Sequence, residues 1–428
     1  MARYQAPRGT QDVLPEDQPY WRWVLGVAHD VAARYGFQPI EVPVFEETEV
    51  FVRGVGTGTD IVEKEMYTFE DRGGRSLTLR PEFTAGIVRA YIEHGMRVRP
   101  QPVKLYAVGP VFRYEAPQAG RYRQHTQISC ECIGEADPLA DFEIMCMAWD
   151  LYAALGFQAV QFQLNSIGCP RCRPPYIRDV LVPYLRSRRE ELNALDVERL
   201  QKNPLRVLDT KEPESQAVVN EAPSITAHLC PECSEHFAQL RFYLDMLERP
   251  YELNPRLVRG LDYYTRTVFE VTAQGLGAQN AVGGGGRYDG LVEVLGGPPT
   301  PGVGFAAGIE RIVLALKAQG AVPPPLPAPQ VFFVHRGRLA KDAAVALADQ
   351  VRRRGLGALV AFGERSVKAQ MRQASKAGAE YVVIIGDDEL AHGEVQVKHL
   401  DTGRQEAVVQ AELVAWLHKR LTAAHSAP

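Results

Sequence analysis

Two pairs of cysteines have a spacing that suits a metal ion. The pairs are Cys169 with Cys172 and Cys230 with Cys233, each in the pattern C-x-x-C. Four thiolates in two such pairs can hold zinc in tetrahedral coordination, which would join the two ends of the segment between them. Reduced thiols at the surface explain the same pattern, so both interpretations stay open at this point.

Charged residues gather around a predicted β-hairpin between residues 103 and 134. Two strand-like segments flank the loop APQAGRYR, and the two-residue period of a strand puts Arg113 and Glu115 on one face of the first segment. The second segment carries Gln127, Ser129 and Glu131 on one face. Arginine side chains there, with Arg121 in the loop, can bind phosphate or carboxylate through paired hydrogen bonds. A solvated sheet face with ion pairs is the alternative.

Three further segments carry candidate binding groups. The spacing of apolar residues predicts a helix from Gly304 to Leu316, with two glycines on the stripe that carries Arg311. The run VGGGGRYDGL predicts a loop, because four glycines are unfavourable in helix or strand and leave main-chain N–H groups free for a ligand. Tyr263 and Tyr264, with Glu82, offer phenols and a carboxylate for a polar pocket.

The composition is that of an ordinary globular protein. The 428 residues are 46% hydrophobic and 23% charged, which excludes collagen, coiled coil and disorder. A membrane span and a signal peptide are not expected, so we predict a cytoplasmic protein. Seven cysteines without a secretion signal favour thiols or metal over disulfides, and Cys130, Cys132 and Cys146 are expected in the core.

Proline and cysteine positions divide the chain into predicted domains. Five prolines between residues 321 and 329 predict an extended linker between a body at 1–320 and a C-terminal domain at 330–428. Residues 169–251, which hold both cysteine pairs, predict an insertion domain. Strand-like segments around the insertion predict a mostly antiparallel sheet, and alternating strands and helices after the linker predict a small α/β domain. The fold class is therefore α+β.

Two common nucleotide-binding patterns are missing from the sequence. No lysine is followed by serine or threonine, which excludes the P-loop pattern, and no G-x-G-x-x-G turn opens a helix. A nucleotide would therefore have to be bound by other means.

Several segments together resemble the histidyl-tRNA synthetases, which are class II aminoacyl-tRNA synthetases. FQPIEVPVFE, with Pro43, resembles motif 1 of the class at the dimer interface; FRYEAPQAGRYRQ resembles motif 2 and GVGFAAGIERIVLAL resembles motif 3. LVRGLDYYTRTVFEV and GGGGRYDGL resemble the two histidine-specific motifs. The C-terminal module resembles an anticodon-binding domain, and the resemblance covers nearly the whole chain.

The resemblance implies a homodimeric ligase that uses ATP and magnesium to charge tRNA(His) with L-histidine. Arg113 would bind the ATP α-phosphate and the histidine carboxylate, and Arg259 would stabilise charge at the α-phosphate. Glu115, Arg121 and Arg311 would also contact ATP. The implied histidine pocket comprises Glu82, Tyr263 and Tyr264 around the imidazole and Thr84, Gln127 and Glu131 around the amino group.

The sequence departs from the family pattern at two positions. The family often has phenylalanine where this chain has His125, which puts stacking on adenine in question, and often glycine where it has Phe83. A non-catalytic paralogue that regulates histidine biosynthesis is the main alternative. Such proteins typically lack the anticodon domain and the arginine motif, whereas this chain has both. A class II synthetase for another amino acid is a third possibility.

Overall fold

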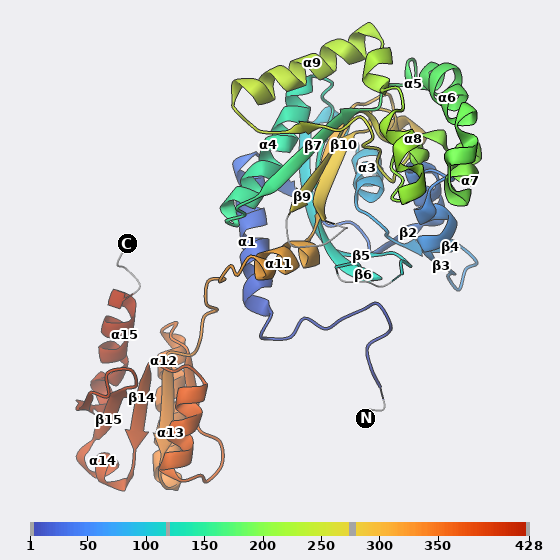
Figure 1. Cartoon of the computed structure of the whole chain (residues 1–428). Coiled ribbons are helices and arrows are strands. Elements are labelled where there is room, and N and C mark those ends of the chain that lie inside the picture. Colours follow the sequence, from blue (N-terminus) through green and yellow to red (C-terminus); the bar gives the residue numbers. More distant parts are fainter. Residues whose placement is uncertain (1–3, 117–119, 274–279, 425–428) are drawn as a thin grey trace. The chain divides into compact units, whose positions relative to one another are not determined.

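The chain forms two compact units, Met1–Pro324 and Pro325–Pro428, each described here by itself. The structure is a computed structural model, and it describes residues 4–116, 120–273 and 280–424. Figure 1 shows the elements of both units in chain order. No helix in these described ranges is long and apolar enough to cross a membrane.

A mostly antiparallel sheet organises the larger unit. Its strand order is β1-β5-β6-β11-β10-β9-β7-β8, and among these described strands only the outer pairs β1/β5 and β7/β8 run parallel. The bounds are β1 Gln38–Pro39, β5 Val103–Phe112, β6 Gln124–Ile133, β7 Val160–Ser166, β8 Glu252–Leu253, β9 Thr265–Ala273, β10 Ala281–Arg287 and β11 Gly302–Gly308. A small second sheet has the order β2-β4-β3, with β2 Phe45–Glu47, β3 Tyr67–Glu70 and β4 Ser76–Leu79. The predicted antiparallel sheet and the β5–β6 hairpin are confirmed.

Helices cover both faces of the large sheet. The main core contains buried residues from α1 (Gln18–Arg34), α4 (Pro138–Ala154), α9 (Pro231–Met246) and α11 (Ile309–Ala318), packed on β6, β7, β9 and β11. A second core lies under α3 (Thr84–Glu93) and α10 (Leu291–Val294), and α2 (Thr48–Val55) contributes to a third. The ribbon places α4 and α3 on opposite sides of the central strands (Figure 1).

Local sequence explains where the main helices begin and which face they bury. α1 starts at Gln18 with Pro19 in its first turn and buries Val24, Ala28 and Val31, which lie three or four residues apart on one face. α4 begins after Asp137, whose side chain accepts a hydrogen bond from the Leu139 N–H at 2.7 Å. Such a cap satisfies one of the N–H groups that a helix start leaves without a partner.

Two predictions for the glycine-rich segments are wrong. The run of four glycines lies in β10, a central strand, and Gly304 lies in β11; the helix starts only at Ile309. A Cβ built on Gly285 would lie 2.0 Å from the Gly304 carbonyl oxygen, so only glycine permits these strands to pack this closely. The apolar spacing after Ile309 is helical, and Phe305 fits the period of a helix as well as that of a strand, so the pattern alone does not mark where the helix begins.

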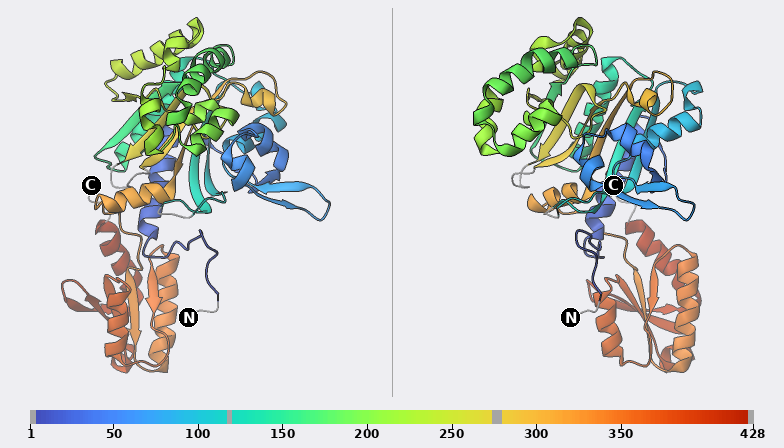
Figure 2. Two further views of the ribbon diagram at one scale, coloured as in Figure 1. Left: turned by 45° about the vertical axis from the view of Figure 1, so that its right-hand side comes forward. Right: turned by 90° about the vertical axis from the view of Figure 1, so that its right-hand side faces the viewer.

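The segment between the cysteine pairs has its own small core. It holds α5 (Arg173–Tyr176), α6 (Val182–Ser187), α7 (Ala194–Lys202) and α8 (Gln216–Asn220), which surround an apolar cluster that includes Tyr176, Leu185 and Val218. Figure 2 shows these helices gathered beside the large sheet. α9, by contrast, packs on α4 and contributes Phe237, Leu240 and Leu244 to the main core.

The C-terminal unit is a five-stranded sheet, within the described residues, with helices on both faces. The strand order is β13-β12-β14-β15-β16, parallel through β14 and antiparallel after it. The strands are β12 Val331–His335, β13 Ala358–Val360, β14 Tyr381–Ile385, β15 Glu394–His399 and β16 Gln405–Val409; the helices are α12 Arg338–Arg353, α13 Val367–Lys376, α14 Asp387–His392 and α15 Leu413–Ala424. α12 and α15 share one core and α13 packs on the other. The prediction of an α/β module is confirmed.

Candidate active site and cysteine cluster

A polar cavity of about 610 Å3 opens over the middle of the large sheet. Strands β6, β10 and β11 form its floor, and the insertion helices and the loop before β9 contribute walls. Every site residue that the sequence predicted apart from the cysteines lines this cavity, namely Glu82, Thr84, Arg113, Glu115, Arg121, Gln127, Glu131, Arg259, Tyr263, Tyr264 and Arg311. The cavity therefore brings together groups that lie up to 229 residues apart in the chain, from Glu82 to Arg311.

Glu131 is a buried carboxylate held by three hydroxyl groups. It is 1% exposed and accepts hydrogen bonds from Thr84 Oγ1 at 2.7 Å, Ser129 Oγ at 2.8 Å and Tyr288 OH at 2.6 Å. Burial raises the pKa of Glu131 to about 7, although the three hydroxyl donors oppose the shift. The solvated sheet face considered above is therefore wrong for Ser129 and Glu131.

Glu131 also explains one of the glycines in β11. A Cβ on Gly304 would lie 2.0 Å from the Glu131 Oε2 atom, because β11 pairs with β6 at this position. Gly304 thus leaves room for the carboxylate beneath the cavity.

Two other polar residues complete this end of the cavity. Glu82 accepts the main-chain N–H groups of Thr84 at 2.6 Å and Ala85 at 2.8 Å, so it holds the start of α3 in place, and burial raises its pKa. Gln127 Oε1 is buried with no hydrogen-bond partner among the described residues. A buried acceptor in a cavity is costly unless something binds it, so this atom suits a ligand that donates a hydrogen bond.

Arg259 lies across the glycine strand. Its Nη1 atom donates to Glu270 Oε2 at 2.6 Å, and its guanidinium would be 2.9 Å from a Cβ on Gly284. The glycine therefore allows the guanidinium to lie close against β10. Arg259 Nε is buried and has no hydrogen-bond partner in the described part of the chain, so this donor is available to a ligand.

The other end of the cavity carries three arginines and an acid. Arg113 follows β5 and donates through Nε to the Pro81 carbonyl at 2.8 Å, which fixes its guanidinium. Glu115 lies 3.3 Å from Arg121 and 4.0 Å from Arg113. Arg311 reaches the cavity from the first turn of α11. Arginines held in this way suit the phosphates of a nucleotide. Residues 117–119 of the predicted hairpin loop lie outside the described residues.

The two residues that depart from the family pattern, His125 and Phe83, have different surroundings. His125 lines the cavity, and burial together with the charge of Arg113 lowers its pKa to about 3, so its ring is neutral at physiological pH. Phe83 is 1% exposed and packs in the core beneath α3, with the Arg80 guanidinium 4.3 Å from its ring centre. Phe83 is not among the residues that line the cavity.

Sequence reasoning missed several residues of the cavity. Tyr288 and Glu270 fall within the motifs quoted above, but their contacts with Glu131 and Arg259 depend on strand pairing. The insertion contributes a further charged group: Arg199, Arg206, Asp209, Lys211 and Glu212. Glu310 accepts the Thr126 N–H at 2.7 Å, and burial raises its pKa to about 7. No periodicity in the sequence pointed to these residues.

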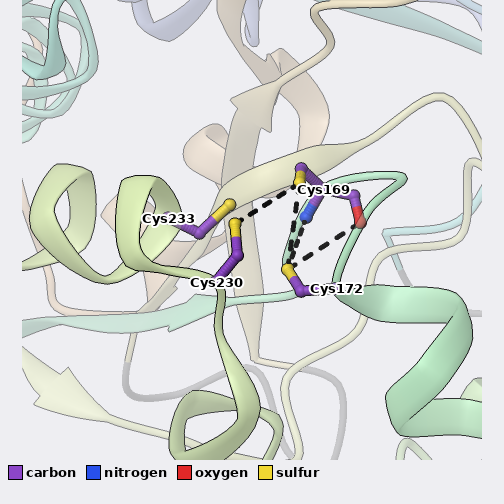
Figure 3. Close-up of side chains that lie close together, drawn as sticks. All are labelled: Cys169, Cys172, Cys230 and Cys233. Atoms are coloured by element: carbon purple, nitrogen blue, oxygen red, sulfur yellow. Dashed lines mark hydrogen bonds between the residues drawn. The ribbon is translucent and has the colours of Figure 1, made fainter.

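The four paired cysteines meet at one point, as Figure 3 shows. Their sulfur atoms all lie within 4.8 Å of one another, and Cys169 Sγ is 3.8 Å from the sulfurs of both Cys172 and Cys230. A tetrahedral zinc with bonds of about 2.3 Å requires sulfurs about 3.8 Å apart, so this cluster has the right size.

The main chain around the first pair also suits thiolates. The Arg171 N–H points to Cys169 Sγ at 3.4 Å, and the Cys169 N–H points to Cys172 Sγ at 3.3 Å. Burial opposes ionisation of Cys169, but the main-chain N–H groups of Arg171 and Cys172 and the neighbouring thiols lower its pKa to about 7. Cys130, Cys132 and Cys146 are buried, as predicted.

Comparison with known proteins gives consistent matches. The family model for histidyl-tRNA synthetase matches residues 9–312, and the anticodon binding domain model matches residues 330–420. A histidine–tRNA ligase of Dehalococcoides mccartyi is 51% identical over 98% of this chain and 100% of its own length, and one of Pelotomaculum thermopropionicum is 50% identical over 97% and 98%. The crystal structure of apo S. aureus histidyl-tRNA synthetase matches with a TM-score of 0.81 and 38% identity, covering 96% of this chain and 99% of that one.

Proposed function

Because the chain belongs to the histidyl-tRNA synthetase family, we propose that its polar cavity is where histidine is joined first to AMP and then to tRNA. The chain is a class II histidine–tRNA ligase: it attaches L-histidine to tRNA(His) through a histidyl-adenylate and releases AMP and diphosphate. The family uses ATP and magnesium. The observation that carries the proposal is that all the implied binding residues line one cavity.

We propose that the two ends of the cavity divide the substrates. At one end, the ionised carboxylate of Glu131 and the Oε1 atom of Gln127 would accept hydrogen bonds from the histidine ammonium group. At the same end, Glu82, Tyr263 and Tyr264 would surround the imidazole. At the other end, Arg113, Glu115, Arg121 and Arg311 would bind ATP. A site that must hydrogen-bond its substrate rejects apolar amino acids strongly, because its own buried polar groups would remain unpaired.

We propose that Arg113 and Arg259 act at the reacting centre. The histidine carboxylate attacks the α-phosphorus of ATP and pyrophosphate leaves, so the site must align two anions and stabilise charge rather than supply a nucleophile. The unpartnered Arg259 Nε supports this role, because a donor is then available to the α-phosphate. Magnesium bound with the phosphates supplies further charge neutralisation.

The role of Arg259 can be tested by substitution. Arg259→Ala should reduce the rate of ATP–pyrophosphate exchange at saturating histidine by about 10²–10³-fold, the usual cost of one charge-stabilising donor. Arg256→Ala is the matched control, since that guanidinium binds Asn220 Oδ1 at 2.6 Å instead. Normal exchange in Arg259→Ala would refute the role.

We propose a homodimer through the motif 1 segment at residues 37–46. Phe45 is 50% exposed beside Phe69, which is 43% exposed, and rings of this size are usually buried. A second copy of this chain is the proposed partner. Phe45→Glu should shift the mass measured by sedimentation from dimer to monomer. A monomeric wild-type protein would contradict this proposal.

We further propose that the domains span 1–320, with the insertion at 169–251, and 330–428. We also propose that Cys169, Cys172, Cys230 and Cys233 hold one structural zinc ion. The size of the sulfur cluster supports the metal. Purified protein should contain one zinc per chain by elemental analysis, and Cys230→Ser should lose it. We also propose a cytoplasmic location, because tRNA charging supplies translation.

A further inference from the structure

The turn that carries the first cysteine pair lies directly behind the wall of the proposed histidine pocket. Four hydrogen bonds join residues 167–173 to residues 264–266. Arg173 Nη1 donates to the Tyr264 carbonyl at 2.8 Å, and Thr265 Oγ1 donates to the Gly168 carbonyl at 3.3 Å. The Arg266 N–H donates to the same Gly168 carbonyl, and the Ile167 N–H donates to the Arg266 carbonyl, both at 2.8 Å. Tyr264 itself lines the cavity.

Arg266 shows that this connection holds the chain in an unfavourable shape. Its φ is +53°, in the left-handed region that residues other than glycine rarely adopt. Such a conformation costs free energy and persists only where neighbouring contacts impose it. Here the contacts are the two main-chain hydrogen bonds to Ile167 and Gly168, the residues just before Cys169.

The shape of the turn at residues 168–172, which carries the first cysteine pair, depends on what holds the cysteine sulfurs together. Gly168 has a φ of +69°, and a Cβ there would lie 2.8 Å from Cys172 Sγ, so the turn is folded tightly around that sulfur. Besides the sulfur cluster, an exposed ion pair between Arg171 and Glu232, at 2.6 Å, joins the two cysteine pairs, and Tyr176 OH donates to the Pro223 carbonyl at 2.6 Å close to them. Exposed ion pairs stabilise little, so a bound cation would be what holds the four sulfurs, and with them the turn at residues 168–172, in this arrangement.

Arg173 links the two sites most directly. It follows Cys172 immediately as the first residue of α5, so its position is set by the cysteine turn. Its guanidinium then donates to the carbonyl of Tyr264, a residue that lines the proposed imidazole pocket. The arginines at the ATP end come instead from the β5–β6 hairpin and from α11.

We infer that the four-cysteine centre positions the histidine pocket through Arg173, so that metal loading raises the affinity of the cavity for histidine while leaving its affinity for ATP unchanged. This inference rests on the proposed zinc site and the proposed histidine pocket. Arg173 is a positioning residue, since it acts on the substrate through Tyr264. Thiol-oxidising conditions that release the metal would therefore weaken amino-acid binding.

The test measures zinc content and the dissociation constants of histidine and ATP by calorimetry on the full chain. Wild type, Arg173→Gln and the control Arg178→Gln are each compared in zinc-loaded and metal-depleted form, and Cys230→Ser, which should hold no zinc, is measured as purified. Arg178 is a suitable control because its exposed side chain pairs with Asp179 at the surface. Chelator and free zinc are removed by desalting before titration, because free zinc binds histidine.

We expect depletion of the wild type to weaken histidine binding on the order of tenfold, within the range of ordinary coupling between sites, with ATP binding unchanged. Arg173→Gln should retain zinc yet bind histidine as weakly as the depleted wild type, and depletion should add little to it, since both changes break one connection. Arg178→Gln should behave as wild type.

The remaining outcomes separate the inference from its premises. Zinc-loaded wild type that fails to bind histidine would contradict the proposed pocket, and protein without stoichiometric zinc would contradict the proposed metal site. Stoichiometric zinc with histidine affinity unaffected by both depletion and Arg173→Gln would overturn the inference alone. Equal loss of histidine and ATP binding on depletion would overturn it too, because that result indicates general unfolding.

Discussion

Tyr288→Phe removes one hydroxyl group from the buried Glu131 cluster and keeps the aromatic ring. Tyr288 OH donates to Glu131 Oε2 at 2.6 Å, and Thr84 and Ser129 donate to Oε1. Burial raises the pKa of Glu131 to about 7, and the three donors keep it from rising further. Without the phenol, the ionised carboxylate loses one donor, so the pKa of Glu131 must rise.

The structure sets the size of the effect. A hydrogen bond to a charged group contributes about 1.5–3 kcal/mol, and 1.36 kcal/mol corresponds to one pKa unit, so the upper bound is about two units. Protonated Glu131 still accepts a hydrogen bond, so we predict a shift of about one unit. If ionised Glu131 binds the histidine ammonium group, the ionised fraction at pH 7 falls from about one half to about one tenth, an approximately fivefold loss.

The assay is kcat/KM for histidine in ATP–pyrophosphate exchange, measured from about pH 6 to pH 9. The acidic limb of this profile reports the pKa of the free enzyme. It should move up by about one unit in Tyr288→Phe, and the two enzymes should converge near pH 9. Tyr152→Phe is the matched control, since Tyr152 is buried and its hydroxyl has no hydrogen-bond partner among the described residues. Titration of the substrate imidazole is common to all three enzymes. An unmoved limb in Tyr288→Phe would refute the reasoning.

Three other perturbations test separate parts of the account. Removing the residues after Pro329 should impair tRNA charging far more than histidine activation, and equal loss of both would contradict a separate anticodon module. Gly285→Ala should lower the free energy of unfolding in urea by about 1–3 kcal/mol, because its Cβ would lie 2.0 Å from a carbonyl oxygen; Gly290→Ala, with open space around the Cβ, should change it little. Glu310→Gln should flatten the pH dependence of stability. Burial raises the Glu310 pKa from 4.5 to about 7, so the free energy of unfolding of the wild type falls as the pH rises through that interval. If its slope against pH were the same in the variant, the raised pKa would not belong to Glu310.

Strand alternation predicted the polar face of β6 correctly but not what covers it. Gln127, Ser129 and Glu131 follow the two-residue period, whereas Glu131 acquires its partner Tyr288 only when β10 and β11 join the sheet. A long-range contact of this kind leaves no trace in the local pattern. The roles of the cavity residues were therefore implied by family resemblance, and the structure adds their common location.

The glycine run shows why the rest was not predictable. From the sequence, four consecutive glycines indicate conformational freedom, which suggests a loop. In the fold, Gly283, Gly284 and Gly285 are needed because Tyr152, Arg259 and the β11 main chain lie where side chains would be. Glycine is required at these positions because distant segments pack closely there, not because of a local conformational preference. Contact between distant segments also brings the two cysteine pairs together.

ATP–pyrophosphate exchange with each of the twenty amino acids in turn tests the central claim most directly. Purified protein with magnesium should support exchange with histidine alone, because only an imidazole satisfies the buried polar groups at the Glu131 end of the cavity. Exchange with another amino acid would contradict the proposed pocket. No exchange with any amino acid, from correctly folded protein, would contradict adenylate formation in this cavity and favour the regulatory paralogue.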